Sequence, residues 1–426
     1  MMKKLLMLAA AAIFSAAVNA AWDTVNYDES AVAPYVLPEL LKCKDGRVVK
    51  NSQEWEKFRR PEILADYTKI MYGKYPADVE SVEYEFLSEK TDAVENTAVR
   101  REIRLIFTGK NQKRFYFDML LYLPKNAKGK VPVFVGLNFK GNHAIESDPT
   151  IGLSGLKGLD DPVSERGKRA HRFPLKTILS RGYAVATACY HDLFPDRADG
   201  WQQSCYTLFF TAEQLKNPPR ADHTAIGAWS WGICRMLDYL EKLPETDTSR
   251  AAVFGHSRLG KTALWTGAND TRFKLVCVND AGEGGSALIR RNFGETLYLM
   301  FSHRKKYGER WFSSNLKPFT KDVKTLPFDQ HMLMALVAPR SLVIHSATED
   351  LWADPKGEYL SAFHAGPVYK FYGNTVLGSE KMPEADKGTN GDISYLLRTG
   401  KHDLLLADWL HYLDAADRAF GKNPER

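Results

Sequence analysis

The sequence has few of the features that mark common protein classes. Its five cysteines, in a chain of 426 residues, lie far apart and form no C-x-x-C pair, so the spacing of a metal knuckle is absent. Because the number is odd, at least one thiol stays unpaired, and we expect mostly buried free thiols. The cysteines are Cys43, Cys189, Cys205, Cys234 and Cys277.

Charge blocks and repeats are also missing. The chain carries a formal net charge of +6, but its basic residues do not gather in a tail or stripe. Nucleic-acid-binding proteins usually concentrate lysine and arginine in this way, so we expect no nucleic-acid partner. Without internal repeats, low-complexity stretches or Pro/Gly/Ser linkers, residues 21–426 are predicted to form a single domain.

The only long apolar run lies at the amino terminus. Lys3 and Lys4 precede the apolar residues 5–18, and small residues follow them. A basic start, a core too short to span a bilayer and a small-residue cleavage site predict a secretory signal peptide, residues 1–20, cleaved near Ala20. No later run is long enough to cross a membrane. We expect a secreted or periplasmic monomer without a membrane partner.

Short β-rich runs alternate with helical stretches after residue 130, which is typical of a mostly parallel, doubly wound sheet. The predicted strands are 131–139, 183–190, 250–255, 273–279, 341–346 and 368–372, and the predicted helices are 52–72, 173–181, 221–243, 258–268 and 330–337. Alternating polar and apolar residues at 84–87, 99–107 and 115–123 predict antiparallel N-terminal strands. The fold class is therefore α/β, a three-layer sandwich with an α/β-hydrolase fold.

Ser257 stands in the most distinctive local pattern, VFGHSRLGK over residues 253–261. A strand that ends in glycine, then a serine, then a helix rich in small residues predicts a strained turn that exposes the serine hydroxyl at the carboxyl edge of the sheet. The general pattern is G-x-S-x-G, whereas the second glycine here comes one position late, at Gly260. A serine that only caps the next helix is the alternative. Ser257 is the predicted nucleophile.

A hydrolase of this fold supplies its acid and its base after the serine. His402 lies in a turn-rich loop, RTGKHD over residues 398–403, between the last predicted strand and a C-terminal helix, and it is the predicted base. Asp280 and Asp350 each follow a predicted strand, and either can orient the imidazole. The residues alone leave this choice open, and each carboxylate can also serve only in a turn.

Hydrogen-bond donors for a developing oxyanion are expected next to the serine. The backbone amide of Arg258 follows the nucleophile directly, and the loop 138–142 can add another donor. The acidic loop 190–199 matches no standard ligand spacing, so we expect solvated carboxylates there and no metal. A Ser–His–Asp reaction also requires no organic cofactor.

Several motifs resemble carbohydrate esterase family 15, the glucuronoyl esterases. The segment GHSRLGK, residues 255–261, is similar to the G-x-S-R-x-G-K signature of that family, in which the second glycine is displaced in the same way. Other similar segments, spread over nearly the whole mature chain, are 136–143, 280–285, 291–296, 329–331, 338–340, 350–355 and 400–403. The resemblance implies hydrolysis of esters of (4-O-methyl-)glucuronic acid, as in lignin–glucuronoxylan linkages, without a cofactor.

The resemblance also implies roles for the catalytic residues. Ser257 matches the nucleophile, His402 matches the base, and Arg258 matches an arginine that helps to hold the oxyanion. The acid of the family stands at the position of Asp280 or at that of Asp350, and this chain resembles the members that carry a carboxylate at both.

Three more residues match positions that bind the substrate. Lys261 shares a helix face with Arg258 and can direct a cation toward sugar hydroxyls. Glu295 and Trp352 match residues that contact the glucuronate, and the tryptophan offers an apolar face for the sugar ring. The segment 301–316 is longer and more basic than the family pattern, so the resemblance does not predict the details of sugar recognition there.

Two other functions remain open at this stage. An acetyl-xylan esterase, or another carbohydrate carboxylesterase, would use the same three residues on a different ester. A non-catalytic glycan-binding protein would keep the hydrolase scaffold without turnover, because fold alone does not fix function. A peptidase is disfavoured, since no propeller-like repeats precede the predicted site. The expected partner is glucuronoxylan or another glucuronate-ester substrate.

Overall fold

The computed structural model describes residues 25–76, 78–302 and 306–421. The predicted signal peptide, residues 1–20, lies outside the described residues. Within them, no helix has both the length and the apolar character needed to cross a bilayer. All five cysteines are buried and free, which confirms the prediction of buried free thiols.

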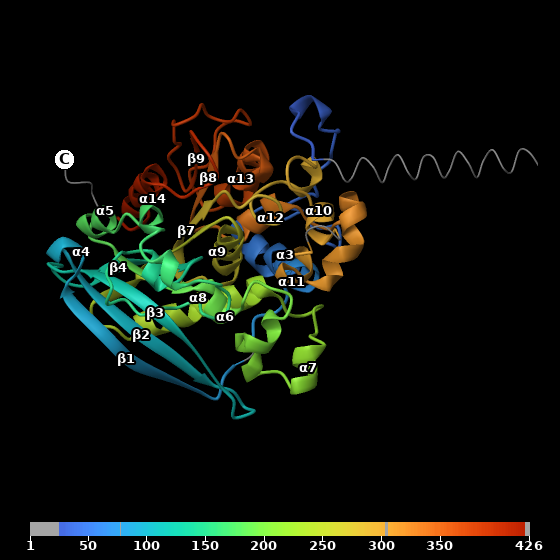
Figure 1. The fold of residues 1–426 in the computed structure, drawn as a ribbon. Coiled ribbons are helices and arrows are strands. Elements are labelled where there is room, and N and C mark those ends of the chain that lie inside the picture. The colour runs from blue at the N-terminus through green and yellow to red at the C-terminus, as the bar shows by residue number, and fades with distance from the viewer. Residues whose placement is uncertain (1–24, 77, 303–305, 422–426) are drawn as a thin grey trace, which may run out of the picture.

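Nine strands form one mixed sheet in the order β1-β2-β3-β5-β4-β6-β7-β8-β9 (Figure 1). Pairing is antiparallel from β1 to β5 along this order and parallel from β5 to β9. The strands are β1 (Ser81–Asp92), β2 (Ala98–Thr108), β3 (Arg114–Pro124), β4 (Val131–Asn138), β5 (Ala184–Cys189), β6 (Thr246–His256), β7 (Phe273–Asn279), β8 (Ser341–Ala347) and β9 (Ile393–Arg398). The predicted α/β-hydrolase arrangement, antiparallel strands followed by a parallel sheet, is confirmed.

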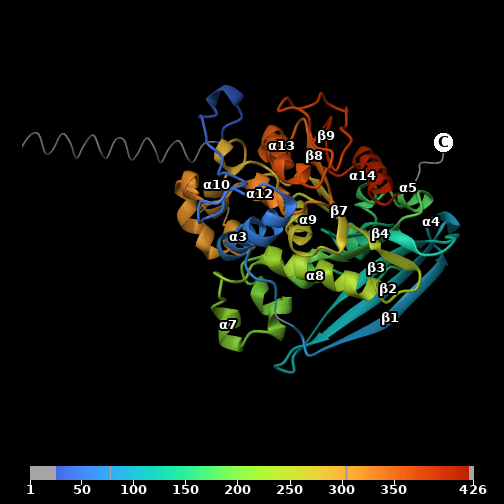
Figure 2. The same ribbon diagram turned by 180° about the vertical axis from the view of Figure 1, so that it is seen from behind.

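Helices cover both faces of this sheet because both faces are apolar. Consecutive residues of a strand point to opposite sides, and Val133 and Val135 of β4 belong to one core while Phe134 between them belongs to the other. Figure 2 shows α8 (Ala225–Leu240) and α9 (Arg258–Asn269) on one side of the sheet, and α5 (Leu175–Ser180) and α14 (Leu406–Ala419) on the other. The arrangement is a three-layer sandwich.

The remaining helices are short, apart from α13. They are α2 (Ser52–Glu54), α3 (Arg60–Tyr67), α4 (Ala93–Asn96), α6 (Tyr190–Leu193), α7 (Ala212–Lys216), α10 (Leu297–Phe301), α11 (Gly308–Trp311), α12 (Gln330–Ala335) and α13 (Pro355–Lys370). The helix predicted over 52–72 forms as α2 and α3 with a π-helical segment after each of them.

The predicted strand 368–372 is wrong, because this run ends helix α13. Its buried positions Ala362, Ala365 and Val368 recur at helical spacing and face the core. Asp354 caps the N-terminus of this helix, since its carboxylate accepts a hydrogen bond of 2.9 Å from the backbone N–H of Gly357. The actual last strand, β9, was not predicted, and it lies next to β8 at the sheet edge.

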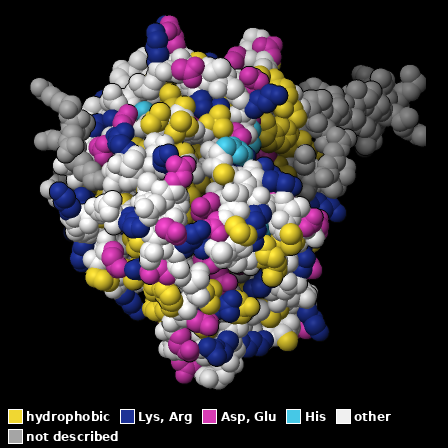
Figure 3. Space-filling view, turned by 60° about the vertical axis from the view of Figure 1, so that its left-hand side comes forward, with side chains coloured by type: hydrophobic (Ala, Val, Ile, Leu, Met, Phe, Trp, Pro, Cys, Tyr) yellow, Lys and Arg dark blue, Asp and Glu magenta, His cyan; other side chains and the backbone are white. Residues whose placement is uncertain are grey.

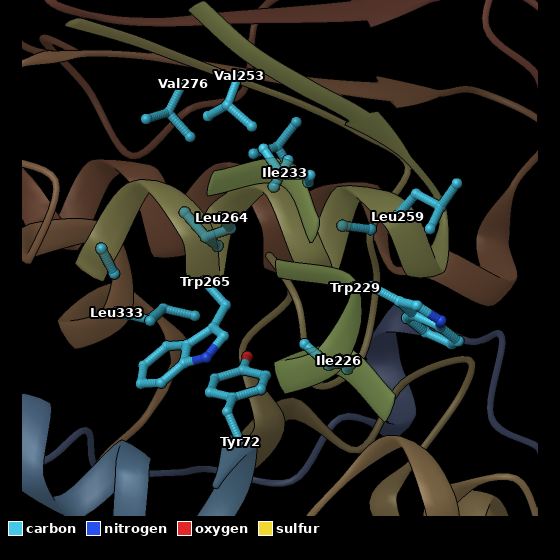
Figure 4. Packing of buried hydrophobic residues seen from close by; sticks show 14 of the residues in the cluster. Tyr72, Ile226, Trp229, Ile233, Val253, Leu259, Leu264, Trp265, Val276 and Leu333 are labelled. Atoms are coloured by element: carbon cyan, nitrogen blue, oxygen red, sulfur yellow. The ribbon is translucent and has the colours of Figure 1, made fainter. Parts of the chain in front are cut away.

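Aromatic packing connects one core to the loop that follows β7. The rings of Trp265 in α9 and Tyr72 stack with centroids 4.6 Å apart, below the β6 and β7 valines (Figure 4). The Tyr72 hydroxyl then donates a hydrogen bond of 2.9 Å to the carbonyl of Gly284. The core therefore fixes the loop after Asn279, which begins with one of the two predicted acids.

The surface carries charges of both signs side by side. On the face shown in Figure 3, lysine and arginine side chains alternate with carboxylates, and hydrophobic side chains lie between them. Oppositely charged side chains of the protein also form ion pairs, for example Arg101 with Glu89 at 2.7 Å. Each exposed pair contributes only about 0–1 kcal/mol, so this mixture says little about stability.

Candidate active site

Ser257 occupies a strained turn between β6 and α9. Its φ of 57° and ψ of −130° lie outside the regions that non-glycine residues usually adopt. The side chain makes no capping hydrogen bond to α9, so the alternative of a simple helix cap is wrong. The turn places Ser257 beyond the carboxyl end of β6, at the edge where the parallel strands end.

The glycines around this turn lie where the packing is close. A Cβ atom at Gly255 would lie 2.0 Å from the backbone oxygen of Leu259. At Gly260 it would lie 3.1 Å from both the Ala281 side chain and the carbonyl of Asn279. The displaced second glycine thus allows the first turn of α9 to approach the loop after β7.

His402 and Asp350 meet above the same sheet edge. His402 Nδ1 lies 2.5 Å from Asp350 Oδ2, and a carboxylate acceptor makes Nδ1 the protonated nitrogen. The Asp350 side chain is 6% exposed and that of His402 is 40% exposed, so the imidazole reaches solvent while its partner is shielded. This tautomer leaves Nε2 free to accept a proton.

A buried arginine holds the loop that carries His402. Arg398 ends β9, and its guanidinium donates hydrogen bonds to the carbonyls of Lys401 at 2.8 Å and Asp403 at 3.0 Å, on either side of His402. The same group donates to the Asp408 carboxylate at 3.0 Å, which anchors it to α14. Arg398 therefore fixes the backbone on both sides of the predicted base.

Asp280 lies nearby but is isolated. Its carboxylate is fully buried and has no hydrogen-bond partner among the described residues. Arg398 stands 3.8 Å away and His256 3.9 Å away. Burial, together with the Glu358 and neighbouring carboxylates, raises the pKa of Asp280 well above its usual range. Burial therefore favours the protonated form of Asp280 more than that of an exposed aspartate.

Asp280, Asp350 and His402 have ligand atoms within 4.8 Å of one another, a separation that suits a metal ion. Their chemistry fits a cation poorly. The Nδ1 atom of His402 already donates to Asp350, and the Arg398 guanidinium supplies the positive charge that faces Asp280. The three groups are better described as a hydrogen-bonded pair with a buried carboxyl group beside it.

The Arg258 side chain is held by a buried carboxylate. Asp196 accepts a short hydrogen bond from Arg258 Nη1, one of 2.6 Å from Arg310 and one of 2.8 Å from the Trp311 indole. Burial alone would raise the pKa of Asp196, but the Arg258 and Arg310 guanidinium groups hold it below its usual range. The expectation of a solvated acidic loop is wrong for Asp196, whose side chain is 2% exposed.

Arg258 also retains a free donor. Its guanidinium carbon lies 4.7 Å from the Trp311 ring centroid, and its buried Nε has no hydrogen-bond partner among the described residues. The loop 138–142 is less available than expected. The Gly141 amide donates to Asn138 Oδ1 at 2.9 Å and the Asn142 amide donates to Ser154 Oγ.

The predicted sugar-binding residues form a second group. The Lys261 ammonium is buried and donates to the carbonyls of Ala281 and Glu283 at 2.6 Å each, with Glu295 Oε2 at 3.5 Å. It therefore ties down the loop after β7, and its burial lowers the pKa of this lysine. Glu295 also accepts a short hydrogen bond from the Tyr307 hydroxyl.

One cleft of about 550 Å³ brings all of these groups together. Every site residue predicted from the sequence lines it: Ser257, Arg258, Lys261, Asp280, Glu295, Asp350, Trp352 and His402. Tyr307, Arg310 and Trp311 line it too, and these were not predicted as site residues. The only sign of them in the sequence was the unusual length and basic character of the segment 301–316.

The sheet, the strained serine turn and the histidine–carboxylate pair define the class of α/β-hydrolases. A family model described as fungal glucuronyl esterase matches residues 205–373. A curated relative, carbohydrate esterase MZ0003 from an unknown prokaryotic organism, is 38% identical over 406 residues, which cover 92% of this chain and 91% of the relative.

Solved structures give the same result. A glucuronoyl esterase from Solibacter usitatus superposes with a TM-score of 0.86 at 38% identity, over 92% of this chain and 100% of that one. A promiscuous esterase of carbohydrate esterase family 15 from a marine bacterial metagenome gives 0.82 at 39% identity, over 93% and 100%. The chain belongs to carbohydrate esterase family 15, the glucuronoyl esterases, and is a carboxylic ester hydrolase.

Proposed function

We propose that this chain hydrolyses esters of (4-O-methyl-)glucuronic acid, such as those that join lignin to glucuronoxylan, with Ser257, His402 and Asp350 as its triad. The single observation that carries the proposal is the composition of the cleft. Ser257 and the His402–Asp350 pair share it with Glu295 and Trp352, an acceptor and an aromatic face that suit a sugar ring.

The reaction proceeds through an acyl-enzyme. His402 Nε2 takes the proton of the Ser257 hydroxyl while Oγ attacks the ester carbonyl, and a tetrahedral oxyanion forms. The carbon–oxygen bond to the alcohol then breaks, and His402 gives its proton to the leaving oxygen. Water, deprotonated by the same histidine, attacks the acyl-enzyme and releases glucuronate and Ser257.

Asp350 is the triad acid in this proposal. Its hydrogen bond to Nδ1 orients the imidazole and stabilises the imidazolium that forms when His402 takes the proton. In this proposal Asp280 is protonated, because burial beside other carboxylates raises its pKa. A neutral acid there reduces the negative charge next to the pair without replacing Asp350.

Donors for the oxyanion come from Arg258. Its backbone amide follows the nucleophile, and its side chain is fixed by Asp196 and by the face of Trp311. A preorganised donor stabilises the developing charge more than a mobile one, because little reorganisation is needed during the reaction.

Recognition of the glucuronate ring falls to the other end of the cleft. Trp352 offers its apolar face, and Glu295 accepts from sugar hydroxyls while Tyr307 and Lys261 fix its two oxygens. In this proposal Lys261 acts mainly on the protein side, since its ammonium is already bonded to two carbonyls.

The test is hydrolysis of benzyl glucuronate and of acetylated xylan by the wild type and by Ser257→Ala. We expect turnover of the glucuronate ester, loss of at least 10³-fold in Ser257→Ala, and little activity on acetyl groups. Preference for acetylated xylan would favour an acetyl-xylan esterase. A folded wild type that retains xylan but turns over neither ester would support a glycan-binding protein and overturn the proposal.

The proposed substrate also bears on where the protein acts. A plant-wall polymer is met outside the cytoplasm, so we propose that the chain is secreted or periplasmic, is cleaved near Ala20 and acts as a monomer. N-terminal sequencing of the exported protein tests the cleavage site, and a mature terminus that still contains Lys3 and Lys4 would contradict it.

A further inference from the structure

A second cleft opens beside the nucleophile. It has a volume of about 390 Å³, within the usual range for small-molecule sites, and it shares Ser257, Arg258 and His402 with the first cleft. An ester has an acid half and an alcohol half, and both must find room on either side of the attacked carbonyl. The two clefts that meet at Ser257 supply these two spaces.

The alcohol half belongs in the second cleft, an assignment that rests on the proposed function. Glu295 and Trp352, which suit the sugar, line only the first cleft. His402 lines both and must deliver a proton to the leaving oxygen, so the alcohol leaves past the imidazole.

Cationic side chains dominate the lining of this second cleft. Lys140, Arg169 and Arg172 line it together with Arg258, and no carboxylate does so among the described residues. Glu165 is the loose counter-ion of two of them, at 3.5 Å from Lys140 and 3.8 Å from Arg169. Their positive charge is therefore only partly neutralised.

Two carboxylates that pair with these cations do not themselves line the cleft. Arg172 pairs with Asp403 at 2.6 Å, and Arg258 pairs with Asp196, which is buried. His191, also in the lining, stays uncharged near neutral pH because burial lowers its pKa to about 4. Among the described residues of the lining, an entering group therefore meets cationic side chains and no carboxylate.

An aromatic face adjoins the cations. The ring of Phe139 lies 5.7 Å from the Arg172 guanidinium and 5.9 Å from that of Arg258. Planar guanidinium groups and a phenyl ring together suit a second aromatic ring, by stacking and by cation–π attraction.

We propose that this cleft binds the alcohol half of the substrate and selects aromatic alcohols that carry an acidic group, through Lys140 and Arg169. Both side chains are half-buried and only loosely paired, so each can turn toward a carboxylate on the ring. Arg172 is held by Asp403, next to the catalytic loop, and serves mainly as a stacking surface.

The experiment compares three glucuronate esters whose alcohols are benzyl, 4-carboxybenzyl and a 4-trimethylammonium benzyl analogue. We expect the kcat/KM of the wild type at low ionic strength to be about five- to tenfold higher for the carboxybenzyl ester than for the benzyl ester, with the cationic ester lowest. The ratio shrinks as salt is added, because partly exposed charges are screened.

The double variant Lys140→Gln/Arg169→Gln should bring the carboxybenzyl-to-benzyl ratio close to one. Lys128→Gln is the matched control, because it removes an exposed lysine at the opposite edge of the sheet and should leave the ratio unchanged. Equal kcat/KM for the acidic and neutral esters in the wild type, or an unchanged ratio in the double variant, would overturn the inference. Absence of benzyl ester turnover would instead count against the proposed function.

Discussion

His402 and Asp350 form a hydrogen bond of 2.5 Å between Nδ1 and Oδ2, whereas the neighbouring Asp280 carboxylate makes no hydrogen bond within the described residues. The two acids, which the sequence could not rank, therefore differ sharply in their contacts. Asp350 is placed to fix the imidazole, whereas Asp280 is buried beside it without a hydrogen bond to it.

Asparagine variants at the two positions measure this difference. Asp350→Asn should lower kcat for benzyl glucuronate by about 10³–10⁴-fold, because an amide can no longer impose the correct tautomer on His402. Asp280→Asn should lower kcat by less than about tenfold, since a neutral amide resembles a neutral acid. A larger loss in Asp280→Asn than in Asp350→Asn would reverse the assignment.

Arg398→Lys should lower kcat for benzyl glucuronate by about 10–100-fold with little change in KM. Lysine keeps the charge, but its single nitrogen cannot take the places of both Nε, which donates to Asp408, and Nη2, which donates to the two carbonyls that flank His402. The imidazole therefore loses its fixed position. Steady-state kinetics, with the melting temperature measured alongside, check this expectation.

Arg290→Lys is the matched control for this prediction. Arg290 is also buried and donates to the carbonyls of Leu326 and Phe328, in a different loop. We expect a similar loss of stability without a comparable fall in kcat. If the two variants lower kcat equally, Arg398 has no special role in positioning His402.

Alanine at the two glycines of the serine turn should have unequal costs. Gly260→Ala requires its neighbours to move by a few tenths of an ångström and should cost about 1 kcal/mol of unfolding free energy. Gly255→Ala places Cβ 2.0 Å from a backbone oxygen and should cost about 3 kcal/mol or more. Urea denaturation of both variants measures the two losses of unfolding free energy. Equal losses would contradict the packing described for this turn.

Glu358 gives a prediction about pH and stability. This buried carboxyl accepts a hydrogen bond of 2.8 Å from the Gly282 amide, and burial raises its pKa from 4.5 to about 8. Between these values the unfolded chain has lost the proton and the native state keeps it. Stability therefore falls as pH rises through this window.

Glu358→Gln removes that titration. The free energy of unfolding of the variant, relative to the wild type, should rise from pH 5 to pH 8 by an amount on the order of a few kcal/mol. Urea denaturation at several pH values checks the sign. A difference between the two proteins that stays constant over this range would show that Glu358 titrates normally.

Much of the fold could be predicted because local patterns determine it. The strands 131–139 and 273–279 read as apolar runs since both faces of the sheet are covered, and their bounds were close to β4 and β7. The run 368–372 was predicted as a strand because valine and tyrosine favour strands. It ends helix α13 instead, since the buried residues of this segment recur at helical spacing and Asp354 caps its start. β9 was missed in a turn-rich segment.

The site residues that stand in one continuous motif could be predicted from the sequence. Those that meet only through contacts between distant parts of the chain could not. Ser257 and its glycines form a continuous motif, and His402 follows in the expected order. The group of Asp196, Arg258 and Arg310 joins residues that are 62 and 114 positions from Asp196, and no local pattern encodes it. The choice of Asp350 likewise needed the geometry of two loops.

The most direct test of the central claim is labelling of the native enzyme by a fluorophosphonate, with the site located by mass spectrometry while benzyl glucuronate hydrolysis is followed in the same sample. We expect one phosphonyl group per chain, on Ser257, and loss of hydrolysis in proportion to labelling. Ser257→Ala should stay unlabelled and inactive. A folded protein that hydrolyses the ester while Ser257 remains unmodified, or that carries the label on another residue, would contradict the account.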